Sequence, residues 1–237
     1  MVAGGGIMRG YMLALAVSIG VLAAGLLSGY LCIHLLGASP EALLMAVLRT
    51  PSAQVTITRV EAVSQAVQAV AESMAKAVTP QPGRNIIHEW PVKYLSTALG
   101  IFSTNILTAL GAAVTPILPV LWHRRVSPFL ARISGRSYDP ARSWRSYFRY
   151  MVPFAPVAIL GFNGLMVSIV TSIAGLMAFM MPELAGILCL SAVGVRAALN
   201  SGSPESVEAS YAGFWRVAGL SALLLAIAAL MEARLLA

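Results

Sequence analysis

The sequence predicts an all-α, multi-pass transmembrane helical bundle, and two observations support this. Five apolar stretches fill most of the 237 residues, at residues 12–36, 95–121, 151–181, 183–199 and 212–231. Crossing a hydrocarbon core about 30 Å thick takes roughly 20 helical residues, and every stretch except the fourth reaches that length. In addition, 58% of the residues are hydrophobic and 11% are charged, which excludes an ordinary soluble domain and a disordered chain. We expect residues 1–237 to form a single membrane domain with about five membrane helices, because helices satisfy their own backbone hydrogen bonds in lipid.

The first apolar stretch follows Arg9 and raises the question of a signal sequence. It is too long for one, because the apolar part of a signal peptide covers roughly 7–15 residues and precedes a small-residue cleavage site. We therefore expect it to be retained as the first membrane helix.

The 38–93 region is expected to be an extramembrane insert with an amphipathic helix. Its apolar residues recur at alternating steps of three and four and would form a narrow seam on a helix over residues 54–78: Val60, Val63, Val67, Val70, Met74 and Ala77. The seam would pack on the protein's own membrane domain, on a partner helix or second copy, or on the lipid interface. Near the end of the region, Trp90 and Tyr94 are typical of a membrane-interface anchor.

Residues 122–150 form a strongly basic loop between the second and third stretches. Asp139 is its only acid, against seven arginines: Arg124, Arg125, Arg132, Arg136, Arg142, Arg145 and Arg149. The positive-inside bias predicts that this loop is cytoplasmic. Counting helices from it predicts a protein of the cell membrane with a cytoplasmic N-terminus and an outside C-terminus.

The same arginines alternate with aromatic residues, which suggests two classes of contact. Arginine beside aromatic rings suits anionic lipid headgroups, and it equally suits an acidic protein partner. Nucleic acid is not expected, because an orientation signal already accounts for the charge. We therefore expect contacts with membrane lipids and with a membrane or cytoplasmic protein partner, with a second copy of the chain among the candidates for that partner.

Prolines predict irregular helix ends on the basic-loop side. Pro116 and Pro119 lie near the end of the second stretch, and Pro153 and Pro156 lie near the start of the third. Proline interrupts the helical hydrogen-bond ladder, so breaks are expected at both places. These breaks either shape the bundle or, as in transporters, line a cavity.

Glu183 is the sharpest single candidate residue, because it follows Pro182 between two strongly apolar stretches. If the Met181–Pro182 turn lies at the interface, the Glu183 carboxylate would cap the first turn of the fourth helix and face the positive end of the helix dipole. At membrane depth it would instead be a functional carboxylate. Asn105 and Asn163 lie within apolar stretches, where an amide usually bonds to another helix.

Enzymatic chemistry is not expected from this sequence. The apolar stretches contain no paired Asp, Ser/His or His/Glu cluster. His88 and Glu89 lack the second histidine of a zinc-protease motif. Cys32 and Cys189 are isolated in apolar stretches and are expected to pack as small hydrophobic side chains. No catalytic residue, metal or cofactor is therefore predicted.

Two groups of residues resemble the stage II sporulation protein M-like family of membrane proteins. The run from Glu183 to Val195 is similar to that family's helix that begins with Glu, and an earlier group is similar to its Phe/Asn/Gly helix: Phe102, Asn105, Ile106, Leu107, Leu110 and Gly111. The likeness covers residues 95–236. The family's Pro-His-Gly ahead of the Glu is replaced here by residues 179–182, so the role of that histidine does not carry over. The resemblance implies a multi-pass protein that is one component of an assembly.

These observations lead to a non-enzymatic scaffold or subunit of a membrane complex as the first hypothesis. The alternative is a transporter, permease-like or channel subunit. A Glu-Ala-Ala, three residues, Gly coupling motif would favour the permease, and Glu208-Ala209-Ser210 begins in a similar way. However, the glycine stands at Gly213, one position too early.

Overall fold

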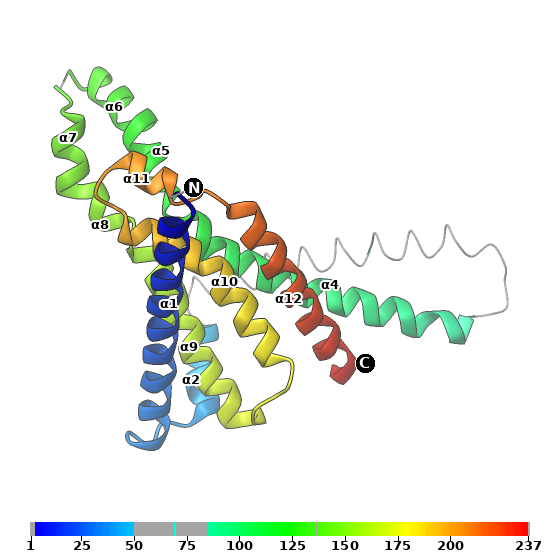
Figure 1. Cartoon of the computed structure of the whole chain (residues 1–237). Helices are drawn as coiled ribbons and strands as arrows, with labels where there is room; N and C mark the ends of the chain where they lie inside the picture. The colour runs from blue at the N-terminus through cyan, green and yellow to red at the C-terminus, as the bar shows by residue number, and fades with distance from the viewer. Residues whose placement is uncertain (1–2, 50–68, 70–84, 136, 237) are drawn as a thin grey trace.

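The computed structural model describes residues 3–49, 69, 85–135 and 137–236, and this part of the chain is built from helices and connecting turns (Figure 1). The long helices are α1 Ala3–His34, α4 Asn85–Val114, α9 Phe154–Ala174, α10 Met180–Leu199 and α12 Phe214–Leu236. Each of these contains, or forms part of, a segment long and apolar enough to cross a membrane, which makes five candidate spans within the described residues. The protein is thus an all-α multi-pass membrane protein, as its sequence predicts.

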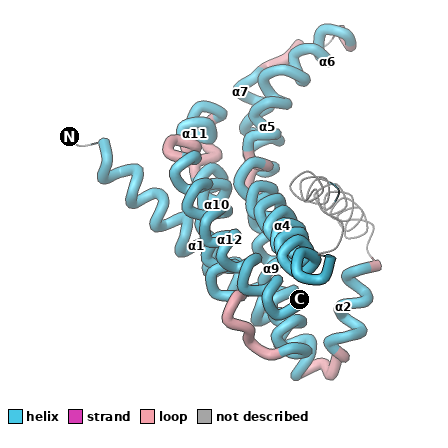
Figure 2. The backbone as a smooth tube through the Cα atoms, turned by 90° about the vertical axis from the view of Figure 1, so that its right-hand side faces the viewer, coloured by secondary structure: helices cyan, strands magenta, loops and turns pink. Residues whose placement is uncertain are grey.

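Short helices connect the spans. They are α2 Pro40–Leu48, α5 Ile117–Leu121, α6 Ser127–Ile133, α7 Pro140–Ser143, α8 Arg149–Met151 and α11 Pro204–Ala209, together with two π-helical turns, η1 Trp122–Val126 and η2 Trp144–Phe148. In the tube view α4, α5 and α6 follow one another away from the bundle, and α7 turns back toward it (Figure 2). The predicted basic loop is therefore helical.

Helix α10 lies at the centre of the bundle and contacts α1, α4, α9 and α12. Half of its spanning window is buried, compared with 22% in each of the other spans. Ser221 of α12 donates to the Gly186 carbonyl at 2.7 Å, and the Tyr11 hydroxyl of α1 donates to the Cys189 carbonyl at 2.7 Å. Hydrogen bonds between helices suit lipid, where an unpaired polar group is costly.

Helices α1 and α9 pack closely because glycines leave their backbones exposed to each other. A Cβ atom added to Gly25 would collide with the Gly161 carbonyl, and one added to Gly164 would collide with the Leu22 carbonyl. Small residues at a membrane helix interface allow this close approach. The packing of α1 against α9 therefore depends on the small size of these glycines as well as on the hydropathy of the two helices.

The two predicted proline breaks are confirmed. Helix α4 ends at Val114, and Pro116 precedes α5. Helix α8 ends at Met151, and Pro153 precedes α9. Both breaks lie where the hairpin of α5 to α8 joins the bundle.

The predicted turn at Met181–Pro182 is wrong. Helix α9 ends at Ala174 and is followed by its C-cap Gly175, whose φ of +77° favours glycine. Helix α10 already begins at Met180. Pro182 fits within the first turn of a helix because the N–H it lacks has no helical acceptor there. The fourth apolar segment is consequently a helix of 20 residues, which is long enough to span.

The 38–93 region is described at its two ends. Helix α2 begins after Ser39, whose Oγ accepts a hydrogen bond from the Ala42 N–H at 3.2 Å, and it packs against α9. The predicted helix over 54–78 lies, apart from residue 69, outside the described residues. The predicted anchor segment belongs to α4, where the Tyr94 hydroxyl donates to the Leu230 carbonyl of α12 at 2.8 Å.

Candidate functional site

The basic segment folds into a helical hairpin, which we define as residues 117–152. Its ascending arm contains α5, η1 and α6, and its descending arm contains α7, η2 and α8. Gly135, with φ of +64°, lies in the turn, and Asp139 caps α7 by accepting from the Arg142 N–H at 3.1 Å. In two perpendicular views the hairpin extends beyond the N-terminal end of α1, away from the bundle (Figures 1 and 2).

A hydrophobic core holds the two arms together and joins them to the bundle. Its buried residues come from the hairpin, α10 and α11: Val120, Trp144, Phe148, Val152, Ala197 and Val207. The Trp144 and Phe148 rings stack with centroids 6.3 Å apart, and Trp144 Nε1 donates to the Ser201 carbonyl at 3.1 Å. Aromatic burial of this kind gives the hairpin a packed interior.

His123 lies inside this hairpin with 6% of its surface exposed. Its ring meets Trp144 and Phe148 edge-on, and the Tyr138 hydroxyl is 2.7 Å from Nδ1 and 3.0 Å from the His123 carbonyl oxygen. Burial lowers the pKa of His123, the adjacent Arg124 charge lowers it further, and Glu205 opposes them. The imidazole is therefore neutral at neutral pH.

Arg124 ties the hairpin to the α10–α12 connector. Its guanidinium donates to Glu208 at 2.7 Å and to Glu205 at 2.9 Å, both on α11. The pKa of Glu205 is held below its usual value by hydrogen bonds to its carboxylate from its own backbone N–H, from Ser203 and from Arg124. All three side chains are substantially exposed, so solvent weakens the attraction and the main effect is orientation. A second tie is the Tyr211 hydroxyl, which donates to the Ala113 carbonyl at 2.6 Å.

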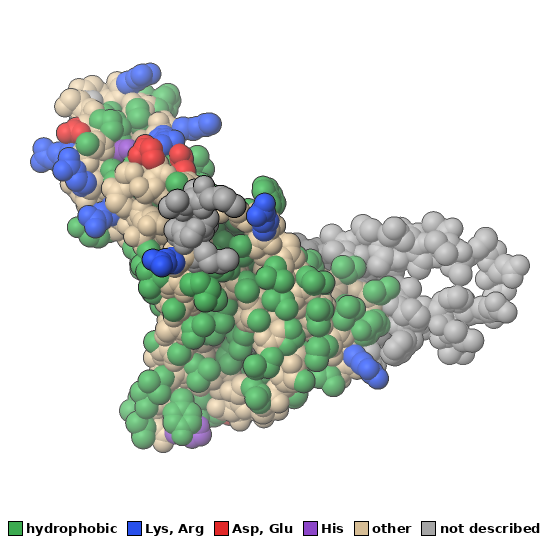
Figure 3. Space-filling model, viewed as in Figure 1, with side chains coloured by type: hydrophobic (Ala, Val, Ile, Leu, Met, Phe, Trp, Pro, Cys, Tyr) green, Lys and Arg blue, Asp and Glu red, His purple; other side chains and the backbone are tan. Residues whose placement is uncertain are grey.

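The remaining predicted arginines behave differently from Arg124. Five of them are exposed and form no ion pair within the described part of the chain: Arg125, Arg132, Arg142, Arg145 and Arg149. Arg136 lies outside the described residues. Large apolar side chains are also exposed on the hairpin, among them Trp122, Phe129, Ile133, Tyr147 and Tyr150. In the space-filling view hydrophobic side chains cover the bundle, whereas most charged side chains gather at the hairpin end (Figure 3).

Inside the bundle the structure brings together two predicted residues and one that sequence reasoning missed. The Glu183 carboxylate on α10 faces the Asn105 amide on α4 and the Glu232 carboxylate on α12. Asn105 Nδ2 is buried and makes no well-formed hydrogen bond, so its interaction with Glu183 is a looser electrostatic one. Glu232 directly follows the fifth apolar stretch, a position that sequence reasoning treated as the end of the span. Its proximity to Glu183 comes only from helix packing.

Two expectations about these residues need correction. Glu183 does lie in the first turn of α10, but the helix begins three residues earlier and its own N–H donates to the Phe179 carbonyl. The predicted place of Glu183 in the first turn, near the positive end of the helix dipole, is confirmed. Its predicted role as the cap is wrong, because the helix begins further upstream and Phe179 occupies the N-cap position. The interhelical bond predicted for Asn163 is also wrong, since its Nδ2 donates to Ile159 of its own helix at 2.8 Å.

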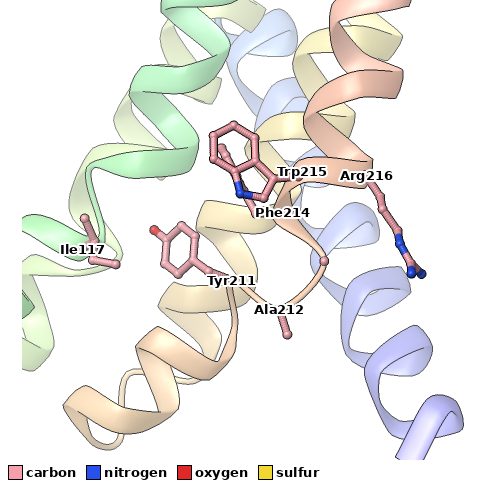
Figure 4. Close-up of a pocket in the computed structure, with 7 residues that line it drawn as sticks. Ile117, Tyr211, Ala212, Phe214, Trp215 and Arg216 are labelled. Atoms are coloured by element: carbon pink, nitrogen blue, oxygen red, sulfur yellow. The ribbon is translucent and has the colours of Figure 1, made fainter.

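An open pocket of about 690 Å³ lies beside the connector (Figure 4). It is lined by Ile117, Tyr211, Ala212, Gly213, Phe214, Trp215 and Arg216. Trp215 is 83% exposed, and the Arg216 side chain points away from the Trp215 ring (Figure 4). A tryptophan and an arginine next to a span are typical of headgroup depth. This pocket is therefore an open surface recess beside the start of α12.

Metal and thiol chemistry find little support in the described residues. No group of three or more His, Cys, Asp or Glu side chains there could hold a metal ion. Cys32 and Cys189 are both free thiols.

Comparison with known proteins adds no relative: no family model, curated protein or solved structure matches the chain. The fold defines a class, the multi-pass helical membrane proteins; the described residues contain five candidate spans and a braced basic hairpin at one end of the bundle.

Proposed function

We propose that this protein is a non-enzymatic scaffold or subunit of a membrane complex and that it engages a protein partner through the hairpin. The observation that carries the proposal is that the basic segment is folded and braced. A segment that only orients a membrane protein needs its charges and no particular structure. This one has a buried aromatic core and a two-carboxylate clamp on Arg124.

A braced hairpin is suited to binding because it is ordered before the partner arrives. Association costs free energy for every loop or side chain that it must immobilise. Here the Trp144–Ser201 and Arg124–Glu208 bonds already hold the two arms against the connector. The exposed aromatic and arginine side chains are then available for contact, and these residue types are enriched at protein interfaces.

The orientation of the protein is part of the proposal. We place the hairpin and the N-terminus in the cytoplasm, the C-terminus outside, and the chain in the cell membrane, on the strength of the arginine excess in the hairpin. The resemblance to the stage II sporulation protein M-like family supports a role as one component of an assembly. Nucleic acid is not proposed as a partner.

Transport is the second candidate function, and one observation favours it. Glu183, Asn105 and Glu232 converge from three spanning helices. Ionisable groups within membrane segments are costly, and in transporters they mark proton or ion pathways. A carboxylate pair beside an amide is suited to holding a proton or a small cation.

The scaffold proposal is tested by extraction in mild detergent and identification of co-purifying proteins. We expect a partner in near-stoichiometric amount that is lost when Phe129→Asp and Ile133→Asp alter the exposed hairpin. The matched control is Leu176→Asp, an equally exposed apolar position at the opposite end of α9, which should retain the partner. A chain that purifies alone, or a partner lost equally in the control, contradicts the proposal.

A further inference from the structure

The descending arm of the hairpin presents an exposed strip of arginine and tyrosine side chains, which we call the docking strip: Arg142, Arg145, Tyr147, Arg149 and Tyr150. Trp144, Phe148 and Val152 recur every four residues and are buried, so the residues between them face away from the core. Tyr147 is 68% exposed and Tyr150 is 69% exposed. The strip is therefore accessible over the whole length of the arm.

The charges of the strip have no acidic partner within the described chain. The two ion pairs of the hairpin both belong to Arg124, and the carboxylate of Asp139 is already engaged in capping α7. Arg145 Nε donates only to the Ala141 carbonyl of its own helix. The protein thus neutralises the arginine that braces the hairpin and leaves those of the strip available.

The length of the arm separates two kinds of anionic occupant. Arg142 lies twelve residues before the start of α9 at Phe154, which corresponds to roughly 18 Å at the helical rise. The headgroup layer adds only about 5–8 Å to each side of the hydrocarbon core, and charge is screened beyond about 8 Å at physiological salt. For a bilayer whose hydrocarbon core ends at the start of α9, headgroups would reach Arg149 but not Arg142, and this favours a protein over a lipid surface as the occupant of the whole strip.

We propose, on the basis of the function proposed above, that the docking strip binds an acidic amphipathic helix of a partner protein. Carboxylates along one side of such a helix meet the three arginines through charge-assisted hydrogen bonds. Its apolar residues cover the Tyr147 and Tyr150 rings, which combine apolar area with few rotatable bonds. Complementary charge also fixes the direction in which the helix lies.

The experiment uses the full chain in nanodiscs of phosphatidylcholine, so that no anionic lipid is present. The probe is a fluorescent synthetic helix with Glu on one side and Leu on the other, and its Lys counterpart is the control peptide. Fluorescence anisotropy at low and at physiological salt gives the dissociation constant. We expect the Glu peptide to bind, the Lys peptide not to bind, and higher salt to weaken binding.

Matched variants locate the site. Arg142→Glu and Arg145→Glu should each weaken binding by about tenfold or more, whereas Arg132→Glu makes the same charge change on the ascending arm and should change it by less than about threefold. An acid at position 142 falls in the first turn of α7, where it suits the helix dipole. Unchanged circular dichroism and Trp144 fluorescence would show that the hairpin is folded.

Equal weakening by Arg132→Glu would reveal non-specific attraction and overturn the proposal. The proposal would also be overturned if the protein bound vesicles containing phosphatidylglycerol in an Arg142-dependent manner and did not bind the peptide, because the occupant would then be lipid. If the peptide fails to bind but a co-purifying partner still depends on the hairpin, the scaffold function stands and the docking strip is wrong.

Discussion

Arg124 in η1 and Glu208 in α11 approach to 2.7 Å although 84 residues separate them in the chain. Their contact joins the hairpin to the connector between α10 and α12. The two helices that carry Glu183 and Glu232 are thereby linked to the hairpin. Any partner that moves the hairpin would act on this connector first.

The first prediction concerns this brace. Arg124→Ala should accelerate hydrogen exchange severalfold in residues 203–211, because the connector loses its tie while the bundle core is untouched. Arg125→Ala is the control, since Arg125 is exposed and forms no ion pair in the described structure. Arg124→Ala and Glu208→Ala should also be non-additive in a double-mutant cycle; equal exchange in both arginine variants would exclude a bracing role.

The second prediction is a loss of stability on mild acidification. The folded pKa of His123 lies below its unfolded value of about 6.5, so the unfolded chain binds more protons between the two values. Stability is therefore fully present above about pH 6.5 and falls as pH drops toward the folded pKa. Melting in detergent should shift down by several °C from about pH 7.5 to about pH 5.5.

His123→Phe should reduce this pH dependence, because it replaces the buried imidazole by a ring that cannot be protonated. The control is His34→Gln at the opposite end of α1, where the side chain is exposed. A pH dependence that survives His123→Phe and disappears in His34→Gln would refute the assignment.

The third prediction separates structural from transport roles of Glu183. Glu183→Gln removes a negative charge that faces Glu232 inside the bundle, so melting should be unchanged or rise by a few °C. Under the scaffold proposal the partner still co-purifies and growth is unaffected. Loss of function with intact stability would instead favour a proton or cation site. Glu41→Gln, at an exposed position on α2, serves as the charge-matched control.

The fourth prediction tests the α1–α9 contact within one helix. Gly164→Ala places a methyl group against the Leu22 backbone, whereas Gly161→Ala places one in open space. Overpacking of this kind costs about 1–3 kcal/mol, so Gly164→Ala should lower the yield of folded protein and its melting temperature. Comparable losses in both variants would mean that the helices do not pack as described.

The fifth prediction concerns orientation. Single cysteines at Ser137 and Leu176, in a chain without Cys32 and Cys189, occupy exposed positions at opposite ends of the bundle. An impermeant thiol reagent applied to intact cells should label position 176 and spare position 137. The reverse labelling would place the hairpin outside and invert the proposed topology.

The sequence by itself determined the helical class, the five spans and the two proline breaks. Hydropathy and the missing N–H of proline are local properties. The helix breaks at Pro116 and Pro153 can therefore be predicted without knowing which segments pack against them. The end of α9 was harder to predict, because Gly175 lies in an apolar run and Pro182 fits inside the following helix.

Only the tertiary structure decided which polar groups meet. Glu183, Asn105 and Glu232 are distant in the chain and converge because α4, α10 and α12 all pack against one another. The same holds for Arg124, which differs from the five other described arginines of the hairpin because α11 lies beside η1. Composition fixes how many charges a segment carries, but the packing of helices determines which of them find a partner and which remain available for another molecule.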